Sequence, residues 1–144
     1  MISTNDIFHS LNQKVRLITK EANEKLKEYN LYSSQWAILY CLDQYGPMKQ
    51  TDIWQYLNVE APTTTRTLAR MESNHWICRS EGKDKRERIV YLTDYAESKL
   101  PAIKNAIFQL EKSLLSHLTE DEQVQFMNLL NKIEFQKEVI SYGD

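Results

Sequence analysis

The sequence has few of the residues that cross-link a chain, break its helices or carry it through a membrane. Two cysteines, three glycines and three prolines occur among 144 residues, which excludes a disulfide framework and favours long helices over many short strands. The longest apolar run, Trp36–Leu42, covers seven residues, whereas a membrane span needs roughly 18. No secretory leader opens the sequence, which predicts a cytoplasmic protein.

The composition is typical of one globular domain with a real core, because 42% of the residues are hydrophobic and 26% are charged. The net charge is only −2, but the charge is unevenly spread. Residues 62–92 hold seven basic and four acidic side chains, whereas residues 93–144 hold five basic and nine acidic ones. A local basic stretch on an acidic chain indicates either a phosphate-binding face or an ordinary solvated surface.

Apolar spacing predicts long helices at both ends of the chain. The stretch from Asp6 to Tyr29 repeats apolar residues every three or four positions, a narrow stripe typical of a helix that lies against another helix, often from a second subunit. Its members are Ile7, Leu11, Val15, Ile18, Ala22, Leu26 and Tyr29. Thr93 is predicted to cap a long helix, and Thr119–Glu122 forms a capping box before a last helix. That last helix carries Val124, Met127, Leu130 and Ile133 on one side.

The middle of the chain predicts three shorter helices and a hairpin. Ser33 or Ser34 is expected to cap a buried helix that contains the run from Trp36. A short helix is expected over Met48–Leu57, with Ile53 and Leu57 facing inward, and Pro62 is expected to open a helix that runs to about Ser73. Two β-branched and aromatic runs then flank a charged loop. These predicted strands are Trp76–Arg79 and Arg88–Leu92.

This order of elements predicts a mainly α fold with a small β-hairpin, a winged helix-turn-helix, whose second helix enters the major groove of DNA. On the helix from Pro62, Thr64, Leu68 and Met71 fall on an inward face, and Thr63, Arg66, Thr67 and Arg70 on an outward one. Arginine can pair bidentately with guanine, and a basic hairpin tip can follow phosphates and place Arg86 in the minor groove. The predicted DNA-binding residues are Thr63, Thr64, Thr65, Arg66, Thr67, Arg70, Lys83, Lys85, Arg86 and Arg88.

The chain resembles the MarR (multiple antibiotic resistance regulator) family of winged helix-turn-helix transcription factors. The residues that carry the resemblance are Thr65-Arg66, Leu68, Arg70-Met71, Trp76 to Arg79, Asp84 to Arg86, Leu92-Thr93, Ser34-Gln35 and Leu118 to Glu122. The resemblance implies a homodimeric regulator that binds pseudo-palindromic operators, usually as a repressor released by a small ligand or an oxidant. It implies a single domain over residues 1–144, with dimerisation helices in 1–30 and 94–144 and a winged-helix DNA-binding lobe in 31–93.

Three positions depart from the pattern of that family. Ala69 replaces an acidic residue, so a wing arginine would lack a partner within the chain. His75 replaces a glycine before the first strand, so this turn needs a left-handed histidine or another geometry. The stretch Thr93–Ala96 lacks a glycine that the family has after Leu-Thr, which concerns only the local start of a helix.

Other chemistries find less support in the sequence. Cys41 lies in the most apolar helix and Cys78 in a strand, so both are expected to be structural thiols, and His9, His75 and His117 lack metal-ligand spacing. No catalytic motif is present, so neither an enzyme nor a cofactor is expected. The aromatic residues Tyr29, Tyr32, Trp36, Tyr40, Trp54 and Tyr56 are expected to be mostly core, and Tyr32, Trp36 and Tyr40 are the candidates for a small aromatic effector.

The sequence therefore predicts a cytoplasmic, homodimeric transcriptional regulator that binds double-stranded operator DNA and responds to a ligand as a repressor. A winged-helix adaptor that binds a protein partner and no specific DNA is the alternative. The operator, the target genes and the effector are not encoded in a recognisable form.

Overall fold

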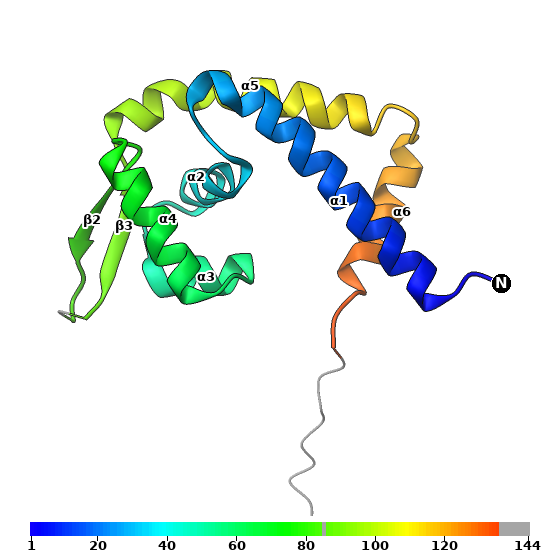
Figure 1. Cartoon of the computed structure of the whole chain (residues 1–144), viewed down its shortest axis with the longest axis horizontal. Coiled ribbons are helices and arrows are strands. Elements are labelled where there is room, and N and C mark those ends of the chain that lie inside the picture. Colours follow the sequence, from blue (N-terminus) through cyan, green and yellow to red (C-terminus); the bar gives the residue numbers. More distant parts are fainter. Residues whose placement is uncertain (85, 136–144) are drawn as a thin grey trace, which may run out of the picture. The chain divides into compact units, whose positions relative to one another are not determined.

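The structure, a computed structural model, describes residues 1–84 and 86–135. These residues form two compact units, residues 1–110 and residues 111 onward, which are described separately. The helices are α1 (Thr4–Leu26), the 3₁₀ turn η1 (Lys27–Tyr29), α2 (Ser33–Tyr45), α3 (Gln50–Leu57), α4 (Ala61–Ser73), α5 (Asp94–Leu114) and α6 (Glu120–Asn131). The strands are β1 (Met48–Lys49), β2 (Ile77–Glu81) and β3 (Arg88–Leu92) (Figure 1). The predicted mainly α, winged-helix fold class is confirmed.

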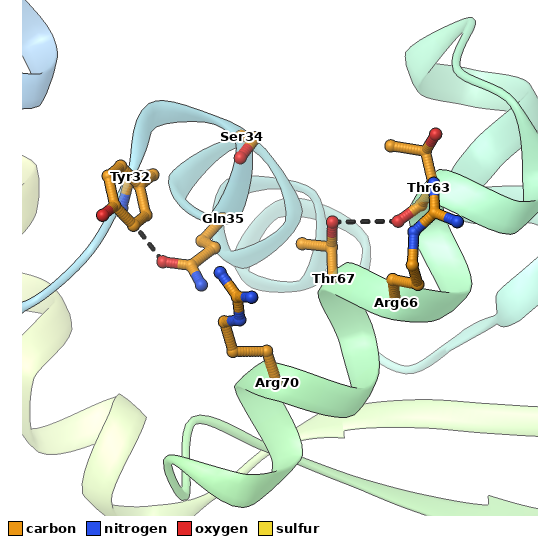
Figure 2. A pocket seen from close by; sticks show the side chains of 7 residues that line it. All are labelled: Tyr32, Ser34, Gln35, Thr63, Arg66, Thr67 and Arg70. Atoms are coloured by element: carbon orange, nitrogen blue, oxygen red, sulfur yellow. Dashed lines mark hydrogen bonds between the residues drawn. The ribbon is translucent and has the colours of Figure 1, made fainter.

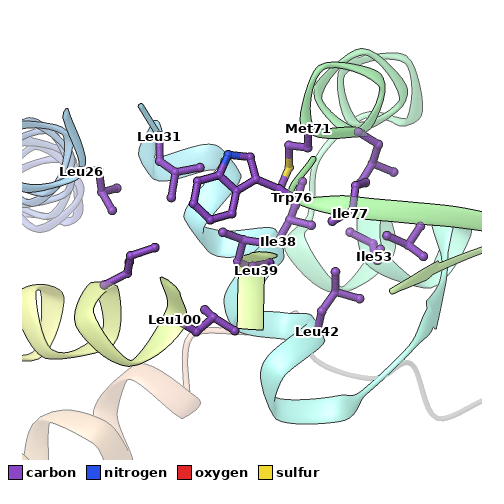
Figure 3. Close-up of a cluster of buried hydrophobic side chains, with 14 of the residues drawn as sticks. Leu26, Leu31, Ile38, Leu39, Leu42, Ile53, Met71, Trp76, Ile77 and Leu100 are labelled. Atoms are coloured by element: carbon purple, nitrogen blue, oxygen red, sulfur yellow. The ribbon is translucent and has the colours of Figure 1, made fainter. Parts of the chain in front are cut away.

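The core of the first unit is built around α2 (Figure 3). Ile38, Leu39 and Leu42 are at most 2% exposed, and their spacing of one and three places them on one face of the helix. Leu26 from the end of α1 and Leu100 from α5 belong to the same cluster. The strongly apolar run of the sequence is therefore the packing centre that holds α4 and the sheet in place.

The beginning of α2 differs from the prediction. Neither Ser33 nor Ser34 caps this helix, because the cap position is Tyr32. The Tyr32 backbone N–H donates instead to Oε1 of Gln35, at 2.9 Å, and the Ser33 N–H donates to Oδ1 of Asn23 in α1, at 2.8 Å. A buried glutamine thus satisfies the backbone N–H of the cap residue itself, where the sequence predicted a cap by a serine hydroxyl.

The sheet has one strand more than predicted. Met48 and Lys49 do not begin a helix but form β1, which pairs antiparallel with β3 in the order β1-β3-β2. Gly46 has a φ of +75°, a conformation that suits glycine, and the chain turns here so that the two residues meet the free edge of β3. The predicted hairpin itself is present, with Ile77 opposite Leu92 and Glu81 opposite Arg88. Its tip is therefore held by strands on a three-stranded base.

The turn between α4 and β2 contains the left-handed histidine that the sequence raised as one possibility. His75 has a φ of +68°. The Trp76 N–H donates back to the Met71 carbonyl at 2.9 Å, and the His75 N–H donates to the Glu72 carbonyl at 3.1 Å. These bonds satisfy the last carbonyls of α4, as in a Schellman motif. Trp76 is then buried and fixes the direction in which the wing leaves the helix.

The last two helices begin as the sequence predicts. The Thr93 hydroxyl accepts the Ala96 N–H at 3.1 Å at the start of α5, and Thr119 and Glu122 form the capping box of α6. Leu100, Ile103 and Ile107 of α5 are buried, whereas α6 has no buried residue. Ile133 lies just beyond the end of α6. In the part of the chain that the structure describes, no helix is both long and apolar enough to span a bilayer.

Candidate nucleic-acid interface

The helix α4 divides its side chains between the core and one exposed face. Pro62 occupies the first turn, where its missing N–H costs nothing, and Leu68 and Met71 are fully buried. Arg66 and Arg70 are exposed on the opposite side. The two arginines therefore stand on a helix that is anchored by its own apolar face.

The threonines of α4 do not share one environment. The assignment of Thr64 to the DNA-facing set is wrong, because its side chain is 2% exposed and its hydroxyl donates to the Glu60 carbonyl at 3.4 Å. The spacing of Thr64 with Leu68 and Met71 already placed it on the inward face, and packing decides its role. Thr63 and Thr65 are exposed, and Thr67 is half-buried. Thr63, Thr65 and Thr67 remain on the candidate interface.

Two of these hydroxyls already use their protons within the helix. Thr65 donates to the Ala61 carbonyl and Thr67 to the Thr63 carbonyl, both at 2.9 Å. Thr65 also accepts a hydrogen bond from the side chain of Gln50 in α3, at 3.1 Å. Hydroxyls held in this way present a lone pair or a methyl group outward, which suits contact with a base edge or a thymine methyl.

The wing tip is a tight, hydrogen-bonded loop. The Gly82 N–H donates to the Glu87 carbonyl, and the Glu87 N–H donates to the Asp84 carbonyl, both at 2.9 Å. A Cβ atom at Gly82 would lie 2.9 Å from the Glu87 Cβ, so this position needs glycine. Lys83, Arg86 and Arg88 are exposed on this loop and its second strand, and the predicted Lys85 lies outside the described residues.

The charges of this region are divided between paired and unpaired cations. Arg79 forms an ion pair with Glu72, and Lys49 forms one with Glu87 at 3.1 Å. By contrast, within the described part of the chain no carboxylate lies within 4.0 Å of any of five basic side chains. These five are Arg66, Arg70, Lys83, Arg86 and Arg88. The unpaired cations are those that the sequence assigns to DNA, and they remain available to phosphates and bases.

A polar network that the sequence analysis missed joins α4, α3 and β2. Arg79 donates to both carboxylate oxygens of Glu72, at 3.2 and 3.4 Å, and to Oε1 of Gln50, at 3.4 Å. Gln50 in turn donates to Thr65. The Arg79 guanidinium holds the pKa of the Glu72 carboxyl below its usual value. The residues are 7, 29 and 15 positions apart, so no local pattern could have revealed the network.

A pocket lies between the beginning of α2 and the exposed side of α4 (Figure 2). Its lining side chains are Tyr32, Ser34, Gln35, Thr63, Arg66, Thr67 and Arg70. Sequence reasoning assigned four of these to DNA and Tyr32 to a ligand, but assigned no role to Ser34 or Gln35. In the sequence, Ser34-Gln35 is only part of the resemblance to the MarR family, and this resemblance was the one signal that pointed to these two residues.

The candidate effector residues do not converge on one described pocket. Trp36 and Tyr40 form a tilted ring pair with centroids 6.0 Å apart, whereas Tyr32 lies at the pocket beside α4. Tyr45 and Tyr56 form a second ring pair, with their hydroxyls 3.2 Å apart. The aromatic residues are thus spread over the α2 and α3 surfaces as well as the core.

The thiols and histidines occupy different environments. Cys41 is 1% exposed, and burial raises the pKa of its thiol, while Cys78 is half-buried. Raised pKa and burial both disfavour the reactive thiolate at Cys41. Among the residues that the structure describes, no cluster of three or more histidine, cysteine or acidic side chains could hold a metal ion.

The chain is similar to known proteins in sequence and in structure. The family model of the MarR family matches residues 31–87, which hold α2, α3, α4 and most of the wing. The chain is similar to the uncharacterized HTH-type transcriptional regulator YwoH of Bacillus subtilis, with 49% identity over 123 residues that cover 85% of this chain and 90% of that protein.

Two similar structures contain DNA. A mutant MarR from E. coli complexed with operator DNA is 26% identical, with a TM-score of 0.78, and the match covers 90% of this chain and 91% of that one. Reduced AbfR bound to DNA, a protein of Staphylococcus epidermidis, is 28% identical, with a TM-score of 0.73 and 88% of each chain covered. This chain therefore belongs to the MarR family of winged-helix, HTH-type transcriptional regulators.

Proposed function

We propose that this protein binds operator DNA as a homodimer and represses transcription, with α4 in the major groove and the wing along the backbone. The observation that carries the proposal is the set of unpaired cations on α4 and the wing. The neighbouring cations Arg79 and Lys49, by contrast, form ion pairs with carboxylates. Arg66 would read a guanine, and Arg86 would enter the minor groove. The operator complex of the similar E. coli protein supports this use of the fold.

The dimer is supported by the incomplete burial of α1. Ala22 and Leu26, at the end of the apolar stripe, pack into the core, whereas Ile7, Val15 and Ile18 are 53%, 51% and 45% exposed. A row of large apolar side chains on a regular helix is costly in water unless another surface covers it. In the proposed arrangement residues 1–30 and 94–144 form the dimer, and residues 31–93 form the DNA-binding lobe.

We also propose that a small effector controls DNA binding. Family membership supports a repressor that a small effector releases, and the Trp36–Tyr40 ring pair offers an aromatic surface on which a planar effector would stack. A protein that binds the operator would act in the cytoplasm with the chromosome, which is where we expect this protein.

Binding titrations of the purified protein on its flanking genomic DNA and on scrambled duplexes of equal length test this proposal. We expect the flanking DNA to bind at least about 10³-fold more tightly at physiological salt, because base contacts add to the phosphate term. Lys14→Ala, an exposed change on α1, serves as the matched control for Arg66→Ala. Retention that is weak, lost in salt and equal on both duplexes would contradict the proposal and favour the adaptor.

A further inference from the structure

The pocket between α2 and α4 gathers hydrogen-bond donors without an acidic residue among its lining side chains. Arg66 and Arg70 contribute two guanidinium groups, which have no carboxylate partner among the described residues. Ser34 contributes a hydroxyl from the first turn of α2, the turn that carries the positive end of the helix dipole. The cavity volume is about 230 Å³, which is enough for a phosphate group.

Gln35 determines which chemistry the pocket accepts. The residue is only 4% exposed, so the orientation of its amide is fixed by its surroundings. A backbone N–H can only donate, and the Tyr32 N–H reaches the Gln35 side chain at 2.9 Å, so Oε1 must face the start of α2. The Nε2 amino group must then point the opposite way. It lines the pocket, and no described residue accepts a hydrogen bond from it.

The Arg70 guanidinium turns toward the same amide (Figure 2). Two donor groups that face one another have no favourable interaction until an acceptor lies between them. The acceptor that suits a cationic guanidinium, an amide N–H₂ and a helix N-terminus together is an oxyanion. The geometry of this pocket is therefore complementary to an anion that reaches it from the exposed side of α4.

We propose that this pocket holds one phosphate of the DNA backbone in each half-site, bound by Nε2 of Gln35 and the guanidinium of Arg70. The inference rests on the proposed DNA binding and deepens it. A backbone phosphate is favoured over a free anion because Arg66 and Thr63 of the exposed α4 face line the same open pocket, so a duplex on α4 brings a phosphate to it. Arg70 then positions α4 on the backbone, and Arg66 is left to read a base.

The substitution Gln35→Glu tests the proposal with the smallest change in shape. A carboxylate oxygen still accepts the Tyr32 N–H, so the start of α2 keeps its bond, but the second oxygen replaces a donor by a negative charge. We expect at least about a tenfold loss of affinity on operator and scrambled DNA alike, because a phosphate contact carries no sequence information. The slope of log affinity against log salt should fall by about 0.9 per phosphate lost.

Neutral methylphosphonate substitutions, placed one at a time along the operator, locate the phosphate. In the parent protein we expect one position per half-site whose neutralisation weakens binding and which becomes silent in Gln35→Glu. Arg70→Gln, an exposed change, should silence the same position. This variant still tests the phosphate contact if Gln35→Glu fails to fold. Lys14→Ala, an exposed change on α1, is the control and should leave that position sensitive.

Three outcomes would overturn the inference. A parent that binds operator specifically, with the same phosphate pattern in both variants, would reject the pocket and leave the proposed function standing. A parent that shows no DNA preference would reject both. Inorganic phosphate that saturates the Gln35 side-chain amide resonance at sub-millimolar concentration, without competing with DNA, would assign the pocket to a free anion.

Discussion

Single side chains on α4 differ in what they can contact, and Arg66 is the exposed arginine that we assign to a base. Arg66→Ala should cost about 1–3 kcal/mol of binding on the operator and relax the preference at one base pair per half-site, because a bidentate contact is lost. The change is on the surface, so the free energy of unfolding should move by less than about 0.5 kcal/mol. Titrations on operators with single base-pair changes measure this.

Lys83→Ala provides the contrast for Arg66. A lysine on the wing contacts phosphate as a point charge, so its loss should weaken binding equally on all sequences and reduce the salt slope by about one. An Arg66→Ala variant that loses affinity in this sequence-independent way would show that Arg66 contacts the backbone and not a base.

The reactivity of the thiols is also a property of single residues. Cys41 is buried and its thiol has a raised pKa, so little thiolate exists at neutral pH and a reagent must wait for the fold to open. We expect an aromatic disulfide reagent to label Cys78 in the native protein, and Cys41 only together with unfolding. The variant Cys78→Ser isolates Cys41, and rapid native labelling of that variant would contradict the assignment.

Between elements, the Glu72–Arg79 ion pair ties α4 to β2 and, through Gln50, to α3. Because the pKa of Glu72 is lowered in the folded state, the pair contributes stability above the unfolded value of about 4.3, and this contribution is lost as pH falls through the folded pKa. We expect Glu72→Gln to lower the free energy of unfolding by less than about 1 kcal/mol at neutral pH, since the pair is partly exposed.

Urea denaturation at several pH values tests this dependence. The difference between parent and Glu72→Gln should shrink as the solution is acidified and vanish once Glu72 is protonated in both states. Lys49→Gln, which breaks the separate ion pair with Glu87, controls for a general loss of surface charge pairs. A difference that persists unchanged in acid would mean that the carboxylate charge is not what joins these elements.

At the same scale, the sequence predicted those elements that depend on spacing along the chain. The inward spacing of Leu68 and Met71, the capping box at Thr119 and the β-branched runs of the hairpin all depend on neighbours within a few residues, and the structure contains them. Strand β1 was missed because Met48 pairs with Val90, a partner that only folding brings near. The cap of α2 was missed for a different reason: Gln35 lies only three residues after Tyr32, but the sequence favoured the serine hydroxyls as the caps. Like β1, the pocket escaped prediction because its residues come from elements, α2 and α4, that meet only in the folded unit.

For the whole molecule, the exposed half of the α1 stripe predicts a dimer. Sedimentation of the full chain at micromolar concentration should give about 34 kDa, twice the chain mass of 17.0 kDa. Val15→Lys places a charge in the exposed part of the stripe and should yield a folded monomer, whereas Lys14→Ala on the polar side should leave the dimer intact. A parent protein that remains at 17 kDa would contradict both the proposed dimer and an operator with two half-sites.

In the proposed complex, two copies of α4 enter successive major grooves of one operator. Hydroxyl-radical footprinting of the parent protein on its flanking genomic DNA tests it most directly, because cleavage reports each sugar along both strands. We predict two protected segments on the same face of the duplex, with centres about one helical turn, roughly 34–36 Å, apart. A single protected segment, or protection that increases with protein concentration without any fixed position, would contradict this arrangement of two α4 helices.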